Sequence, residues 1–160
     1  MATLVDAHLA LHVLLEDRAY LVLEALVAVD VSTARARFDV LAALLEEHMA
    51  FEEEHVLPFY RSVAPKDGPG RADHVDGDHV ILRRQVDAID AALVEMEAAS
   101  TLRAVLERLP ALYRLLATLE HHTAREQRTV YPTLERELDA AFRDDVTAAL
   151  KALVERAPAP

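Results

Sequence analysis

Apolar residues recur every three or four positions along most of the chain, which is the spacing of one face of an α-helix. Four segments carry this pattern, at residues 4–29, 41–59, 75–96 and 112–130. Four long amphipathic helices with short connections predict an all-α fold, an up-down-up-down four-helix bundle. A short C-terminal fifth helix is expected from Asp139 to about Val154. We expect residues 1–160 to form a single domain, because a chain of this length can enclose one core.

Short polar stretches separate the apolar segments and predict where helices begin and end. Ser32 and Ser100 are plausible N-caps of the second and fourth helices, and Asp139 of the fifth. The sequence APKDGPG at residues 64–70 is the one clear loop signal.

Three prolines lie inside the helical patterns. We expect kinks or early helix ends at Pro58 and Pro132, because proline lacks the backbone N–H that an α-helix needs. We expect Pro110 to mark a break or a new start near the head of the fourth helix.

Polar residues interrupt each apolar stripe at a core-facing position. The stretches HMAFEEEHVLPFY and HTAREQRTVYPTL, 74 residues apart, both contain His-x-x-x-Glu. Residues four apart share a helix face, so each Glu lies one turn beyond its His. The first and third helices each place a lone His on their stripe. The resulting set is His8, His48, Glu52, His79, His122 and Glu126.

Burying two carboxylates among four imidazoles in a small core is costly, since each unpaired buried carboxylate costs several kcal/mol. A bound metal removes that cost by compensating the carboxylates and using the imidazole lone pairs. Six donors without sulfur suit two ions of iron, manganese or zinc better than one tetrahedral zinc. The expected pairing is His8 with His48 on one ion and His79 with His122 on the other, with Glu52 and Glu126 bridging.

Composition narrows the remaining possibilities. The chain is 52% hydrophobic, with a formal net charge of −11 and no basic cluster, which argues against binding to nucleic acid or to a membrane. It contains no cysteine, which excludes disulfides, thiolate metal sites and iron–sulfur clusters. The polar N-terminal residues indicate neither a signal peptide nor a membrane span, so we expect a cytoplasmic monomer or homodimer.

The complete pattern resembles the hemerythrin-like, or HHE cation-binding, family over nearly the whole chain. The resemblance rests on DAHLAL with His8, EEHMAFEEE with His48 and Glu52, GDHVIL with His79, and EHHTAREQ with His122 and Glu126. It implies a non-haem di-iron centre, two iron ions with an oxo or hydroxo bridge. The expected ligands are small molecules such as O2, peroxide or nitric oxide.

One departure bears on function. Oxygen-carrying hemerythrins resemble this pattern but have two His four residues apart on the third helix, whereas here Val75 precedes His79 by four positions. His74 lies one place off the stripe and could reach the centre only if the helix is irregular or starts after it. The departure favours redox reaction, sensing or iron handling over oxygen transport.

Two other functional classes compete with the redox hypothesis. In one, the metal only staples a redox-inert bundle that serves for interaction or metal storage. In the other, a ferritin-like oxidase, Glu-x-x-His is needed on two helices; Glu52-x-x-His55 is present, but His121 and His122 have no matching Glu. The ligand set does not distinguish an enzyme from a carrier, a sensor or a storage protein.

Several histidines and acidic residues border the stripes. His12, one turn after His8, could be an extra ligand or a hydrogen-bond partner of one. His55 is expected at the rim and His121 in solvent. Glu53 and Glu54 are expected on a solvated face.

Two aspartates and two tyrosines complete the candidates. Asp6 and Asp78 come near the ligands and are possible hydrogen-bond acceptors for them. Tyr20 and Tyr131 could hydrogen-bond near the centre, although tyrosine at helical spacing is usually a core residue.

Overall fold

The computed structural model describes residues 3–98 and 100–158. These residues form seven α-helices and two π-helical turns, and no strand is found among them. The elements are α1 (Leu4–Val27), α2 (Val31–Phe51), η1 (Glu52–Val56), α3 (Leu57–Val63), α4 (Ala72–Ala98), α5 (Leu102–Arg125), η2 (Glu126–Val130), α6 (Tyr131–Glu137) and α7 (Ala140–Arg156).

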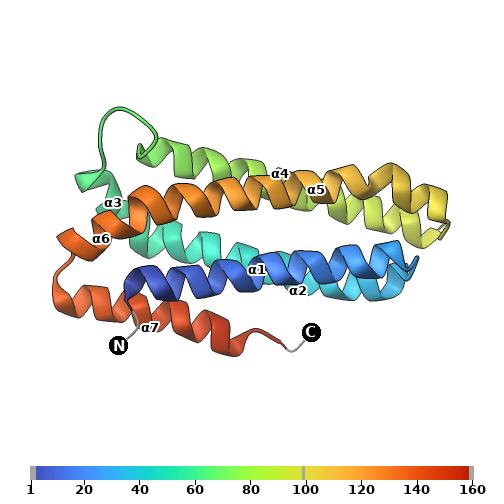
Figure 1. Cartoon of the computed structure of the whole chain (residues 1–160), viewed down its shortest axis with the longest axis horizontal. Helices are drawn as coiled ribbons and strands as arrows, with labels where there is room; N and C mark the ends of the chain where they lie inside the picture. Colours follow the sequence, from blue (N-terminus) through green and yellow to red (C-terminus); the bar gives the residue numbers. More distant parts are fainter. Residues whose placement is uncertain (1–2, 99, 159–160) are drawn as a thin grey trace.

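The long helices α1, α2, α4 and α5 run alternately up and down side by side (Figure 1). Each half of the bundle is a helical hairpin, and α3 and α6 continue α2 and α5 beyond their π-helical turns at one end. The apolar stripes meet in a continuous core that includes Leu15, Leu41 and Leu82, all fully buried. The structure therefore confirms the predicted all-α bundle with a short C-terminal helix.

The predicted N-caps were right for one helix and one or two residues off for two others. Asp139 caps α7 by accepting from the Phe142 amide. For α2 the cap is Asp30, which accepts from the Thr33 amide, and Ser32 only donates to Asp30. For α5 the cap is Thr101, and Ser100 instead donates to a carbonyl at the end of α4. Local sequence marks the helix start, and hydrogen-bond geometry selects among adjacent polar residues.

Pro110 behaves differently from Pro58 and Pro132. α5 runs through Pro110 without a break, so the expected new start there is wrong. Before Pro58 and Pro132 the chain instead forms the π-helical turns η1 and η2, and each proline then lies in the first turn of α3 or α6. There its missing N–H leaves no helical bond unmade, and the wider turn relieves the clash of its ring with the preceding carbonyls.

The helix α7 lies along α1 on the outside of the bundle (Figure 1). It buries Val146, Leu150 and Leu153 against the core. The end of the chain is tied back by Arg18 of α1, which donates to the Pro158 carbonyl at 2.6 Å. No helix within residues 3–98 and 100–158 combines the length and apolar character needed to cross a bilayer.

Candidate metal centre

All six predicted site residues point into the core at one level of the bundle, and all six are fully buried. His8 comes from α1, His48 from the end of α2, His79 from α4 and His122 from the end of α5. Glu52 and Glu126 are the first residues of η1 and η2. The centre therefore lies toward the end of the bundle that carries α3 and α6.

The π-helical turns begin at the two glutamates themselves. The Leu57 amide donates to the Glu52 carbonyl and the Tyr131 amide to the Glu126 carbonyl, so each turn contains one more residue than an α-helical turn. Such bulges occur often at functional sites because they turn the following side chains to new positions. Here the residue after η2 is Tyr131, and its side chain enters the centre.

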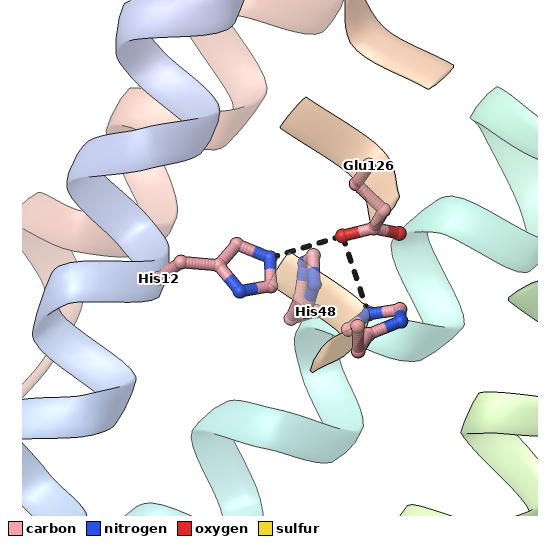
Figure 2. A group of neighbouring side chains, drawn as sticks. His12, His48 and Glu126 are labelled. Carbon is pink, nitrogen blue, oxygen red and sulfur yellow. Dashed lines mark ion pairs between the residues drawn. The ribbon is translucent and has the colours of Figure 1, made fainter. Parts of the chain in front are cut away.

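Three imidazoles surround one oxygen of the Glu126 carboxylate. Its Oε2 lies 2.9 Å from His8 Nε2, 3.2 Å from His12 Nε2 and 3.2 Å from His122 Nε2. His12 thus joins the cluster, and it is as deeply buried as the predicted residues. Figure 2 shows His12 and Glu126 pointing toward each other, with His48 from α2 beside them.

The Glu52 carboxylate faces the other side of the cluster. Its Oε2 lies 3.2 Å from His79 Nε2, 3.5 Å from His48 Nε2 and 4.0 Å from His122 Nε2. Its second oxygen accepts a hydrogen bond of 2.6 Å from the Tyr131 hydroxyl. The Tyr131 ring stacks on His8 with centroids 3.9 Å apart, so this tyrosine contacts both halves of the centre.

Two sets of side chains place their donor atoms within 4.8 Å of one another, which is close enough to share an ion. One set is His12, His48, His122 and Glu126, and the other is Glu52, His79, His122 and Glu126. The expected pairing of His8 with His48 is not reproduced by either set. Their ring centroids are 6.3 Å apart, whereas those of His12 and His48 are 4.7 Å apart.

Many nitrogen and oxygen atoms of the cluster lack hydrogen-bond partners among the described residues. They include both ring nitrogens of His48 and of His122, Nε2 of His12 and of His79, Oε2 of Glu52 and Oε1 of Glu126. Buried polar atoms in folded proteins are nearly always paired. So many unpaired nitrogen and oxygen donors, converging from four helices, fit a bound cation better than a packed polar core.

Burial and charge together set the protonation of the imidazoles. Burial lowers the pKa of His12 and of His48 to about 3, so both are neutral near pH 7. Burial also acts to lower the pKa of His122, but the nearby carboxylates of Glu126, Asp78 and Glu52 together outweigh it and raise the pKa to about 9. For Glu126, burial acts to raise the pKa, yet His122 together with His12 and His8 holds that pKa well below the usual range. A metal would therefore displace the proton of His122 and find two other imidazoles already deprotonated.

Partners outside the cluster orient several of the rings. His79 Nδ1 donates to Glu53 at 2.9 Å, and Arg83 holds that carboxylate with bonds of 2.7 and 3.1 Å. The prediction that Glu53 lies on a purely solvated face is thus wrong. Asp78 lies 3.7 Å from His122 Nδ1 and accepts from Arg125 Nε at 2.9 Å, so it is close to a predicted ligand, as expected.

The other polar residues considered from the sequence lie away from the cluster. His74 is turned toward Arg125, with 3.2 Å between His74 Nδ1 and Arg125 Nη1, and is not among the converging donors. His55 and His121 are exposed, as expected. Asp6 forms a capping box with Thr3 at the start of α1 and has no role in the cluster.

Three residues of this centre are not among the six site residues predicted from the sequence. His12, Tyr131 and Glu53 all contact predicted ligands. The signal for His12 was present, since it follows His8 by one helical turn. Tyr131 and Glu53 carried no comparable signal, because their positions depend on the π-helical turns.

The hemerythrin HHE cation-binding domain matches residues 1–134, which include every residue of the cluster. This chain belongs to the hemerythrin HHE cation-binding domain family. The family and the buried His/Glu groups together suggest a helical protein with a metal cofactor. Neither the curated proteins nor the solved structures gave a significant match. All of α7 lies beyond the matched residues of this hemerythrin-family chain, and it packs on the outside of α1.

Proposed function

We propose that the cluster holds two iron ions and that the protein uses them to bind, sense or react with small oxidants, or to handle iron. The proposed ligands are His8, His48, Glu52, His79, His122 and Glu126. The observation that carries the proposal is the convergence of fully buried, unpaired imidazole nitrogens and carboxylate oxygens on one point between four helices.

The chemistry of the donors suits iron, and the family resemblance favours it. Imidazole and carboxylate without sulfur suit iron, manganese or zinc, and the chain has no cysteine to offer a softer site. Two carboxylates lying between several imidazoles could each bridge a pair of ions, as in other bundles that hold two metals. Iron bound there would supply redox chemistry and a coordination position for a small oxidant.

The surrounding residues would serve this centre in three ways. The Tyr131 hydroxyl fixes one oxygen of Glu52 and leaves the other facing the imidazoles. Glu53, anchored by Arg83, orients His79. The apolar core around the cluster, including Leu11, Leu45 and Leu119, excludes bulk water, which strengthens every charge interaction inside.

The test is elemental analysis of protein purified without added metal, together with its ultraviolet–visible spectrum in air. The proposal expects about two iron ions per chain and near-ultraviolet charge-transfer bands that change with peroxide, O2 or nitric oxide. Glu52→Gln should lower the iron content, whereas His55→Gln, an exposed change within the same π-helical turn, should leave it unchanged. A folded, colourless protein with one zinc would refute the redox proposal and favour the metal-stapled bundle, and a folded protein with no metal would refute both.

A further inference from the structure

His12 is a buried imidazole that the six-ligand proposal does not use. It lies one turn after His8 on α1, it is fully buried, and its Nε2 has no hydrogen-bond partner among the described residues. That nitrogen lies 3.2 Å from Glu126 Oε2 and belongs to the set formed with His48 and His122. In Figure 2 the ring points from α1 straight at the Glu126 carboxylate.

The other ring nitrogen of His12 is held by Thr123, on the facing helix α5. The two atoms, His12 Nδ1 and Thr123 Oγ1, are 2.6 Å apart. The Thr123 hydroxyl has a single proton, and it donates this proton to the Leu119 carbonyl at 2.7 Å. The oxygen must therefore accept from His12, which places the imidazole proton on Nδ1.

This tautomer leaves a lone pair on Nε2, the nitrogen that faces Glu126. A lone pair and an anionic oxygen at 3.2 Å repel each other in a dry core, where charges are poorly screened. A cation between them turns that repulsion into two attractions. The hydrogen bond to Thr123 then has the form that orients metal-bound histidines in general, with the outer nitrogen donating to a fixed acceptor.

We propose that His12 is a seventh metal ligand, held in its ligating tautomer by Thr123. This inference rests on the proposed function, since it requires a metal in the cluster. It brings the imidazoles to five, for two ions that share two carboxylates. Five imidazoles cannot be divided equally, so the two ions would be inequivalent.

Three variants test the proposal through metal binding rather than activity. His12→Leu removes the ligand, and Thr123→Val removes only the acceptor that fixes its tautomer. Thr147→Val is the matched control, because Thr147 makes the same bond to a carbonyl four residues earlier, at 2.8 Å, but lies on α7. Iron content and affinity are measured by competition with a chelator, and Mössbauer spectra report whether the two irons are equivalent.

We expect Thr123→Val to weaken iron binding about 10- to 100-fold, the usual effect of losing a partner that orients a ligand. Thr123→Ser, which retains the hydroxyl, should restore binding, and Thr147→Val should match the parent. His12→Leu should lose affinity and change the Mössbauer spectrum, yet unfold at higher urea concentration than the parent when both are metal-free. A ligand is thus expected to stabilise the metal-bound protein and destabilise the metal-free protein. Loss of a purely structural histidine would instead lower the stability of both the metal-bound and the metal-free protein.

Parental iron affinity and an unchanged Mössbauer spectrum in both His12→Leu and Thr123→Val would overturn the seventh ligand while leaving the metal centre intact. A parent protein that binds no metal would overturn the proposed function and this inference together. If His12→Leu fails to fold, Thr123→Val and Thr123→Ser decide the question alone. In the metal-free protein, 15N NMR should find the His12 proton on Nδ1, and a proton on Nε2 would contradict the proposed tautomer.

Discussion

Removal of the Tyr131 hydroxyl should destabilise the metal-free protein through one hydrogen bond. Tyr131→Phe leaves the ring stacked on His8 and deletes only the donor that reaches Glu52 Oε1 at 2.6 Å. Burial, followed by the charge of Glu52, raises the pKa of Tyr131 well above its ordinary value of 10.0, so the hydroxyl keeps its proton and donates at neutral pH. The change therefore isolates one interaction of a buried carboxylate.

The size of the effect follows from the charge of the acceptor. A hydrogen bond to a charged group contributes about 1.5–3 kcal/mol, and a neutral one about 0.5–1.5 kcal/mol. Tyr60 provides the neutral comparison, since it is equally buried and donates to the Gly70 carbonyl at 2.5 Å. Tyr131→Phe should therefore lower the free energy of unfolding by about 1 kcal/mol more than Tyr60→Phe does.

Urea unfolding of the metal-free variants, followed by circular dichroism near pH 7, measures this difference. With a slope of about 1–3 kcal/mol per molar urea, a loss of about 2 kcal/mol moves the midpoint by roughly 1 M. Equal losses in Tyr131→Phe and Tyr60→Phe would refute a charge-strengthened hydrogen bond to Glu52, and a cation would then be needed to compensate only one of the two carboxylates.

Three further predictions concern the fold. Leu150→Ala, at a fully buried position of α7, should cost about 2–5 kcal/mol in urea unfolding, and a loss near zero would mean that α7 is not part of the core. Pro110→Ala should raise the free energy of unfolding by about 1–3 kcal/mol, because α5 continues through this exposed position; a loss of stability would show instead that a helix begins there. Hydrogen bonds from Thr33 lower the pKa of Asp30 below 3.8, so its contribution as a charged cap is complete above that value and disappears as the pH falls through the lowered pKa. Asp30→Asn should therefore melt at a lower temperature than the parent near neutral pH, and the two melting temperatures should converge as the pH falls through the lowered pKa of Asp30; a gap independent of pH would contradict the charged cap.

The sequence alone determined the helical architecture and the core-facing side of each helix on which the six predicted residues lie. Both follow from helical periodicity, which is local, because a His and a Glu four positions apart must share a face wherever the helix lies. Asp139 was predictable as a cap for the same reason, since a cap satisfies amides only three residues away. Ser32 and Ser100 were not resolved from their neighbours Asp30 and Thr101, because each can form several local bonds.

The tertiary structure decided which side chains join the cluster and how they are held. His12 belongs to the cluster because Thr123 of α5 contacts one of its ring nitrogens and Glu126 of η2 lies beside the other. The spacing of residues within α1 cannot predict which helix packs against it. The positions of Tyr131 and Glu53 depend on the π-helical turns. Each turn contains one residue more than an α-helical turn and so changes the direction of the side chains that follow Glu126 or Glu52. Periodicity fixes the face on which a residue lies. Its partners across the core depend on the packing of helices far apart in the chain, and here that packing brings α1 and α5 together around one carboxylate.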